Sequence, residues 1–193
     1  MNRAIGVALG LAVDRWSGEP PARWHPVAWF GHAMGALERL AWRDSRLAGT
    51  SYTAVGVGGA WLVGAGLRQL VGATPAVAVA TAVAVAGRML DAEGTAVGRL
   101  LVDGDLDGAR RRVRSLVGRT TAEIDEAGIT RAVVESIAEN TTDAVVAPAL
   151  WAAVGGAPAV LAYRAANTLD AMVGHHTDRH ERFGWASARL DVS

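Results

Sequence analysis

The sequence contains no cysteine and no lysine among its 193 residues. Without cysteine it can form no disulfide, thiolate nucleophile or cysteine metal site. All 19 basic residues are arginine, which excludes a lysine Schiff base and the G-x-x-x-x-G-K-[ST] phosphate-binding loop. The formal net charge is zero, so bulk electrostatics give no reason to expect a nucleic-acid partner.

Phenylalanine and isoleucine are also scarce, whereas apolar residues make up 51% of the chain and glycine occurs 23 times. Small residues allow close packing of helices in membranes, and this composition is typical of such helices. A soluble protein from a GC-rich genome can have the same composition, so both classes stay open at this point.

The N-terminal segments predict short helices at a membrane interface. Residues 1–13 are apolar but short for a span of about 20 residues, which favours an interfacial or partly buried helix. Residues 14–26 are rich in Pro and Gly and predict a loop. Residues 27–43 have apolar side chains at helical spacing, with Trp29 and Trp42 as candidate interface anchors.

Two uncharged stretches, 52–67 and 73–87, predict a pair of antiparallel membrane spans. The flanking segments 14–50 and 88–143 then lie on the same side of the membrane. Both flanks are rich in arginine, and the positive-inside rule places that side in the cytoplasm. The alternative is a buried helical hairpin in a soluble protein.

The second half of the chain predicts a polar helical segment followed by a broken apolar one. Within 88–143 we expect an Asp-capped helix that ends at Gly118, and then a helix capped by Thr120 or Thr121. Residues 144–163 are uncharged, and the pair Gly155–Gly156 predicts two half-helices that re-enter the membrane.

Together these patterns predict an all-α fold, namely a polytopic membrane helical protein with short interfacial helices and a cytoplasmic helical segment. We expect a single membrane-embedded domain over residues 1–193. Its parts are a cytoplasmic loop and amphipathic helix (14–50), a membrane hairpin (51–87), cytoplasmic helices (88–143), and re-entrant helices with a second motif (144–193).

The stretch "VESIAENTTD" gathers acidic and amide side chains directly before the broken apolar segment: Glu135, Glu139, Asn140 and Asp143. On a helix, Arg131, Glu135 and Glu139 share one face, and an ordinary ion pair can join Arg131 to Glu135. Hard oxygen ligands of this kind suit Mg²⁺, which binds carboxylates and bridges to substrate phosphates. A helix end with its cap is the simpler alternative.

A second polar stripe follows in "YRAANTLDAMVG", where Tyr163, Asn167 and Asp170 fall on one helical face. Asn and Asp are unfavourable inside helices, so their presence in an apolar helix indicates a structural or functional role. Either they form a polar network between packed helices or they build a second wall of the same ligand site. A re-entrant turn would bring both polar clusters to one cytoplasmic face, where they can converge.

Two further groups are weaker candidates for sites. Glu19 and His25 lie in the predicted loop, where a lone histidine is more often a surface residue than a catalyst. His176 and His180 are four residues apart and could bind zinc, but no H-E-x-x-H pattern or third ligand accompanies them.

The stretch "RAVVESIAENTTDAVVAPALWAAVGGAPAVLAYRAANTLDAMVG", with "GEPPARWHPVAWFG" before it and "RFGWASARLD" after it, closely resembles the CobD/CbiB family. This family comprises the adenosylcobinamide-phosphate synthases of cobalamin (vitamin B12) biosynthesis. The resemblance extends from Asp14 to Asp191.

The resemblance implies a multi-pass enzyme of the inner membrane whose active face is cytoplasmic. Such an amide-forming ligase joins adenosylcobyric acid to (R)-1-amino-2-propanol O-phosphate, with ATP as the energy source and Mg²⁺ as the cation. It implies a corrinoid and an amino-alcohol phosphate as substrates, membrane lipid as surroundings and no nucleic acid; association with further copies or with other corrinoid-pathway enzymes is left open.

On the positions of the matching motifs, the expected catalytic residues are Glu135, Glu139, Asn140 and Asp143, of which Glu139 and Asp143 hold the metal. The expected substrate-binding residues are Glu19, His25, Arg131, Arg164, Asn167 and Asp170.

The chain departs from the family pattern at three places. Gly18-Glu19-Pro20 replaces Gly-Asp-Pro, Arg119-Thr120 replaces Arg-Asp, and the sequence stops after Leu190-Asp191-Val192-Ser193, where family members continue. We therefore expect either the enzyme without its C-terminal part or a non-catalytic membrane scaffold or corrinoid-binding subunit derived from it. An unrelated membrane metal protein built on His176 and His180 is a third hypothesis.

Overall fold

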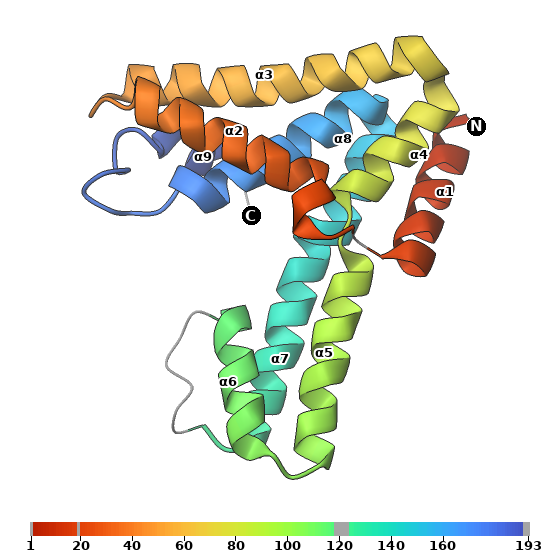
Figure 1. Cartoon of the computed structure of the whole chain (residues 1–193), viewed down its shortest axis with the longest axis vertical. Helices are drawn as coiled ribbons and strands as arrows, with labels where there is room; N and C mark the ends of the chain where they lie inside the picture. The colour runs from red at the N-terminus through yellow and green to blue at the C-terminus, as the bar shows by residue number, and fades with distance from the viewer. Residues whose placement is uncertain (1, 19, 118–123, 191–193) are drawn as a thin grey trace. The chain divides into compact units, whose positions relative to one another are not determined.

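The computed structural model describes residues 2–18, 20–117 and 124–190, and every regular element in these ranges is a helix (Figure 1). The prediction of an all-α fold is therefore confirmed for this part of the chain. The helices form two compact units. The first unit consists of Met1–Val85 and Ala147–Ser193, and the second of Ala86–Val146, close to the predicted polar segment.

The first unit contains α1 (Asn2–Ser17), the 3-10 helix η1 (Ala22–Trp24), α2 (Pro26–Ala41), α3 (Arg46–Val71), α4 (Ala73–Ala84), α8 (Ala147–Val173) and α9 (Trp185–Leu190). Helix α1 continues to Ser17, so the predicted loop 14–26 is shorter than expected. Helix α2 begins as expected, because Pro26 suits the first helical position and needs no N–H partner there.

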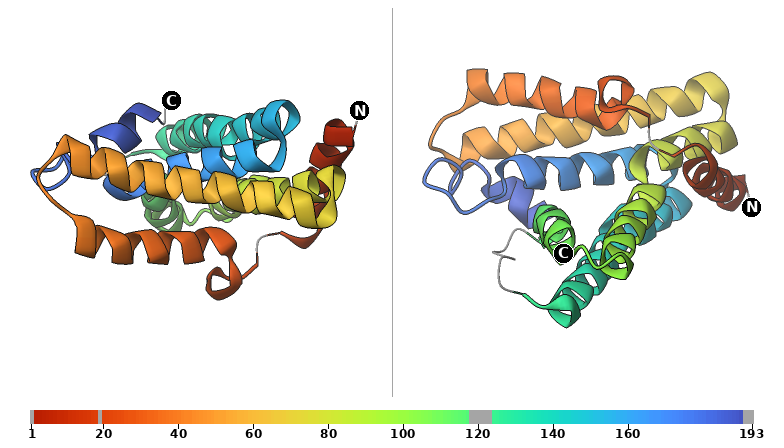
Figure 2. Two further views of the ribbon diagram at one scale, coloured as in Figure 1. Left: turned by 90° about the horizontal axis from the view of Figure 1, so that it is seen from above. Right: turned by 60° about the horizontal axis from the view of Figure 1, so that its bottom comes forward.

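Helices α2, α3 and the second half of α8 run side by side within this unit (Figure 2). Glycines allow the closest approach: a Cβ atom on Gly64 of α3 would lie 2.6 Å from Cα of Pro158 in α8. A Cβ atom on Gly49 would overlap the carbonyl oxygen of Phe183. This close packing of backbones is what the small-residue composition predicts.

Helix α4 packs mainly against α1 and α8 and meets α3 at the turn through Gly72. The chain turns sharply there because Gly72 has φ 83°, a conformation that favours glycine. Helix α1 provides the partner surface for α4, since a Cβ atom on Gly10 would lie 2.6 Å from Cβ of Thr81. The two predicted spans are therefore helices joined by a turn, and the close partner of α4 is the N-terminal helix.

The predicted break in the broken apolar segment is confirmed within α8. Gly156 has φ 75° and ψ −161°, which only glycine adopts readily, and Pro158 stands in the first turn after it. The rings of Trp151 and Tyr163 stack with centroids 6.4 Å apart. In a straight helix these two residues would be separated by a rise of about 18 Å, so the chain folds back at Gly156.

Arg3 of α1 supports this fold-back by donating to the carbonyl oxygen of Val154 at the end of the first half of α8. The last carbonyl groups of a helix lack partners within it, and a cation there also matches the helix dipole. The N-terminal helix thus contacts both α4 and the turn of α8.

The second unit consists of α5 (Gly87–Val102), α6 (Leu106–Val117), α7 (Glu126–Thr141) and the π-helical segment η2 (Thr142–Val146). Its core is a cluster of Val97, Ala109, Val113, Ile129 and Val133. The pairs on α6 and α7 are each four residues apart, and Leu100 and Leu101 join Val97 on α5, so each helix turns one apolar face to this core.

Aspartates begin two of these helices. The Asp105 carboxylate accepts from the N–H of Gly108 at 2.8 Å, which confirms the predicted Asp-capped helix. Asp125 accepts from the N–H of Gly128 at 2.8 Å and is the N-cap of α7. The prediction that this helix begins after Thr120 or Thr121 is wrong, because Asp125 caps it; the two threonines themselves lie outside the described residues.

Three helical segments are long and apolar enough to cross a membrane: Arg46–Val71, Ala73–Val102 and Glu126–Val173. Helix α3 leaves large apolar side chains exposed, among them Val55, Leu62 and Leu70. Exposed apolar side chains along such a helix are suited to contact with lipid.

Candidate functional site

Helix α7 and the π-helical segment carry the acidic cluster of the second unit. Glu135 and Glu139 are exposed and make no hydrogen bond or ion pair within the part of the chain that the structure describes. Asp143 is half-buried in the π-helical segment. Single π-turns disturb the regular spacing of side chains and occur often at functional sites. The π-turn alters the angle between Glu139 and Asp143, which an ordinary helix would place on one face.

Asn140 differs from its acidic neighbours because its side chain is turned back onto its own helix. Its amide nitrogen donates to the carbonyl oxygen of Ser136 at 2.7 Å and lies 3.2 Å from the Ser136 hydroxyl. These bonds use the donors of the amide and leave its oxygen as the group that can accept from a ligand.

The ion pair that could join Arg131 to Glu135 is not formed in the described part of the chain. Both side chains are exposed and border an open hollow together with Thr130 and Val134. An exposed pair of this kind gains only about 0.5 kcal/mol, which does not offset the entropy of ordering two long side chains. Arg131 is therefore available to an anionic group.

The donor types on α7 and η2 suit a magnesium ion only in part. Among the described residues no group of three or more His, Asp or Glu side chains is placed to hold a metal ion. Mg²⁺ is commonly bound by one or two carboxylates together with substrate phosphates and water. Glu139 and Asp143 provide two carboxylates of the kind that such a site uses.

In the first unit, the second half of α8 carries the other polar stripe. Arg164 donates to the side-chain oxygen of Asn167 at 3.2 Å, so these two residues act as one group. The Asp170 carboxyl lies over Gly174, directly after the helix. Tyr163 stacks on Trp151 and supports the fold-back of α8. The contacts of the stripe described here are local to α8 and its end, so they decide neither for a network between helices nor for a ligand site.

Arg164 also borders a mainly apolar cavity of about 400 Å³ formed by α2, α3, α4 and α8. Apolar side chains such as Phe30, Met34 and Val63 make most of its wall. An apolar pocket with a few polar groups is the usual form of a small-molecule site.

The N-terminal motif contributes one buried residue among the predicted site positions, His25. Glu19 lies outside the described residues. His25 is only 8% exposed, in contrast to the surface position usual for a loop histidine, and it caps α2 by accepting from the N–H of Val27 at 3.2 Å. Asp14, which was not among the predicted site residues, is 6% exposed. Its spacing of four from Gly10, and of eight from Gly6, is the signal that could have indicated it.

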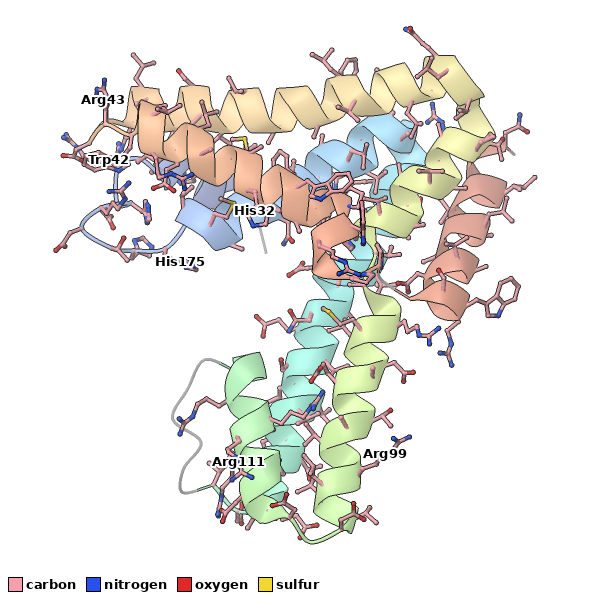
Figure 3. The ribbon with its side chains drawn as sticks, viewed as in Figure 1. His32, Trp42, Arg43, Arg99, Arg111 and His175 are labelled. Carbon is pink, nitrogen blue, oxygen red and sulfur yellow. The ribbon has the colours of Figure 1, made fainter. Side chains whose placement is uncertain are left out.

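The zinc hypothesis for His176 and His180 finds no support in their contacts. His180 bonds to Glu38 of α2 at 3.1 Å, and His176 bonds to Glu181 at 3.0 Å. Arg179 also donates to Glu38, at 3.1 Å, and its guanidinium lies 4.8 Å from the ring centroid of Trp42. Figure 3 shows Trp42 and His175 at this end of the first unit.

These contacts give Trp42 a structural role. Its indole N–H donates to the carbonyl oxygen of Arg179 at 3.1 Å, so the ring is held by the protein instead of serving only as an interface anchor. The contacts of Glu38, Trp42, Arg179 and His180 fasten the segment after α8 to the end of α2.

Through Glu38, the stability of these contacts depends on pH. Burial raises the pKa of Glu38, but hydrogen bonds and charges from His180 and Arg179 outweigh it and hold the pKa below the ordinary 4.5. A lowered pKa stabilises the fold above the ordinary value, and this stabilisation is lost as the pH falls through the folded-state pKa. We expect the melting temperature of the wild type to fall more steeply below about pH 4.5 than that of Glu38→Gln.

Tryptophan fluorescence during heating in detergent measures this difference. Glu181→Gln is the matched control, because its partner His176 is exposed and the pair contributes little. Equal slopes for the wild type and Glu38→Gln would contradict the assigned role of Glu38.

Fold and site together define an all-α protein with three potential membrane-crossing segments, an acidic cluster on α7 and η2, and an Arg–Asn–Asp stripe on α8. Residues 7–192 match the family model described as CobD/Cbib protein, and the chain belongs to this family. The resemblance seen in the sequence motifs is thereby confirmed.

The chain is 48% identical over 193 residues to the cobalamin biosynthesis protein CobD of Mycobacterium tuberculosis H37Rv, covering 98% of this chain and 61% of the relative. It is 43% identical over 202 residues to CobD of Chromobacterium violaceum, covering 99% and 64%. For CobD of Rhodobacter capsulatus the identity is 38% over 203 residues, with coverage of 99% and 64%. The chain thus spans less than two thirds of these relatives. No solved structure matches it.

Proposed function

We propose that the chain is an adenosylcobinamide-phosphate synthase, or the larger part of one, and acts in cobalamin biosynthesis. The observation that carries the proposal is the family match over residues 7–192, supported by relatives named cobalamin biosynthesis protein CobD. The reaction would join the carboxyl of adenosylcobyric acid to the amine of (R)-1-amino-2-propanol O-phosphate. The three apolar segments and the arginine-rich flanks support an inner-membrane enzyme with a cytoplasmic active face.

Amide formation from a carboxylate requires activation, because the carboxylate oxygen is a poor leaving group. Transfer of the terminal phosphoryl group of ATP to the corrinoid carboxylate gives ADP and an acyl phosphate. Attack by the neutral amine on the acyl carbon then forms the C–N bond, expels inorganic phosphate and releases one proton. Catalysis of such steps depends mainly on positioning and on stabilising the charge of the phosphoryl oxygens.

In this proposal Glu139 and Asp143 would hold Mg²⁺, and the ion would supply positive charge to the phosphoryl oxygens when bound. Arg131 in the second unit would bind phosphate oxygens, and Arg164 in the first unit would bind an anionic group of a substrate, because the planar guanidinium suits both. Glu135 and Asn140 bind polar groups beside the metal. Asn167, held by Arg164 at 3.2 Å, and Asp170 contact the side-chain amides of the corrinoid.

Complementation tests the proposed function. The chain, and a version extended with the remaining segment of the Mycobacterium tuberculosis relative, are expressed in a strain blocked at cobinamide-phosphate formation. We expect the extended version to restore growth that depends on cobalamin, and mass spectrometry of extracts to show adenosylcobinamide phosphate. Rescue by the intact relative without rescue by either version of the chain would contradict the proposal.

A further inference from the structure

The buried face of α1 brings a carboxylate against α4. Gly6, Gly10 and Asp14 are four residues apart and therefore lie on one face of the helix, and all three are buried. A Cβ atom on Gly6 would lie 2.8 Å from the carbonyl oxygen of Thr74, and one on Gly10 would lie 2.7 Å from that of Ala78. This close approach draws the next residue of the face, Asp14, into the protein, where it is 6% exposed.

His25 reaches the same region from the start of α2. It is 8% exposed, and its Nδ1 accepts the N–H of Val27 at 3.2 Å. Because Nδ1 serves as an acceptor, the hydrogen of the neutral ring lies on Nε2. The orientation of the ring is fixed by this helix cap.

Asp14 and His25 line one cavity of about 300 Å³ within the first unit. Ser17 adds a hydroxyl group, and Val79, Ala82 and Val83 of α4 form an apolar wall. This volume is at the lower end of the range for ligand pockets, so it suits a small molecule and is too small for a corrin ring. Burying a carboxylate costs free energy, and ionisable groups between apolar helices commonly mark functional sites.

We propose that this cavity binds the primary ammonium group of a small amino alcohol. The Asp14 carboxylate accepts hydrogen bonds from the ammonium, and the His25 ring lines the same cavity beside the substituent on the adjacent carbon. The apolar wall of α4 contacts the carbon chain. The inference rests on the proposed function and deepens it, because it assigns the amine substrate to the N-terminal motif and leaves the corrinoid and phosphoryl groups to other residues.

Isothermal titration of the purified protein in detergent tests the site. The probes are 1-amino-2-propanol, its O-phosphate, and 1,2-propanediol, which lacks the amine. We expect both amines to bind and the diol to show no heat of binding. Asp14→Asn should raise the Kd for the amines at least tenfold, whereas Asp178→Asn, which changes an exposed aspartate of the same unit, should leave it unchanged.

A second variant keeps the test valid if Asp14→Asn fails to fold. Ala82→Leu retains both polar groups and fills the cavity from α4, and it should weaken amine binding to a similar extent. Thermal melting without probe reports the folding of each variant. The proposal is overturned if the wild type binds neither amine, if the diol binds equally well, or if the folded variants bind the amines as the wild type does.

Failure of this site is distinguishable from failure of the proposed function. If the extended enzyme forms product and Asp14→Asn leaves the KM for the amine unchanged, the site is wrong and the function stands. If no product forms under any condition but amine binding is lost in Asp14→Asn, the site stands and the function is wrong.

Discussion

Alanine at Gly49 or Gly64 of α3 should lower the melting temperature strongly, whereas alanine at Gly58 or Gly66 of the same helix should raise it. At Gly49 the added Cβ would overlap the carbonyl oxygen of Phe183, and at Gly64 it would lie 2.6 Å from Cα of Pro158. Both obstacles belong to the backbone and cannot move as a flexible side chain can. We expect a loss of about 3 kcal/mol or more, at the upper end of the cost of overpacking.

The two control positions have no atom within 4 Å of the added Cβ. Alanine there removes the helix-weakening effect of glycine and should stabilise the protein by about 0.5–1 kcal/mol. Thermal unfolding in detergent, followed by tryptophan fluorescence, compares the four variants. A decrease of similar size in all four would show that α3 does not pack against its neighbours through Gly49 and Gly64.

The sequence was informative wherever a local rule decides the backbone. Asp105 caps a helix as expected, and Gly156 breaks the apolar segment because its conformation strongly disfavours any residue with a Cβ. The predicted start of α7 was wrong. Several residue types that can cap a helix occur between Gly118 and Glu126, and local propensity does not choose among them.

Tertiary partners could not be predicted in the same way. That α4 packs on α1 depends on Gly6 and Gly10, which are also compatible with an unpaired interfacial helix. For the same reason Asp14 was overlooked, since only the partner helix makes its face a buried one. The contacts of Glu38 with Arg179 and His180 join positions more than 140 residues apart, and no periodicity in the sequence connects them.

The sequence supplies the residue types of the candidate site, but it does not determine how their side chains are arranged. Arg164 and Asn167 are in contact, as expected for two positions three apart on one helix. Asn140, by contrast, donates to the backbone of its own helix, a competing bond that amide side chains form readily. Kinetic measurements test the proposed roles of Glu139 and Asp170.

In an enzyme extended to the length of its relatives, Glu139→Gln should reduce kcat at least about 100-fold, because it removes the charge of the carboxylate that we propose as a magnesium ligand. The Mg²⁺ concentration needed for half-maximal rate should rise as well. Asp170→Asn should mainly raise the KM for the corrinoid, since we propose that Asp170 contacts this substrate and not the phosphoryl group. Steady-state assays that vary magnesium and each substrate separate these effects.

Two variants serve as matched controls for the kinetic measurements. Glu126→Gln changes an exposed carboxylate in the first turn of the same helix as Glu139, and Asp178→Asn changes an exposed carboxylate in the segment after α8. Both should keep near wild-type kinetics. Wild-type turnover in Glu139→Gln would remove this residue from the metal site and leave Asp143 as its candidate carboxylate. An unchanged corrinoid KM in Asp170→Asn would restrict Asp170 to a structural role at the end of α8.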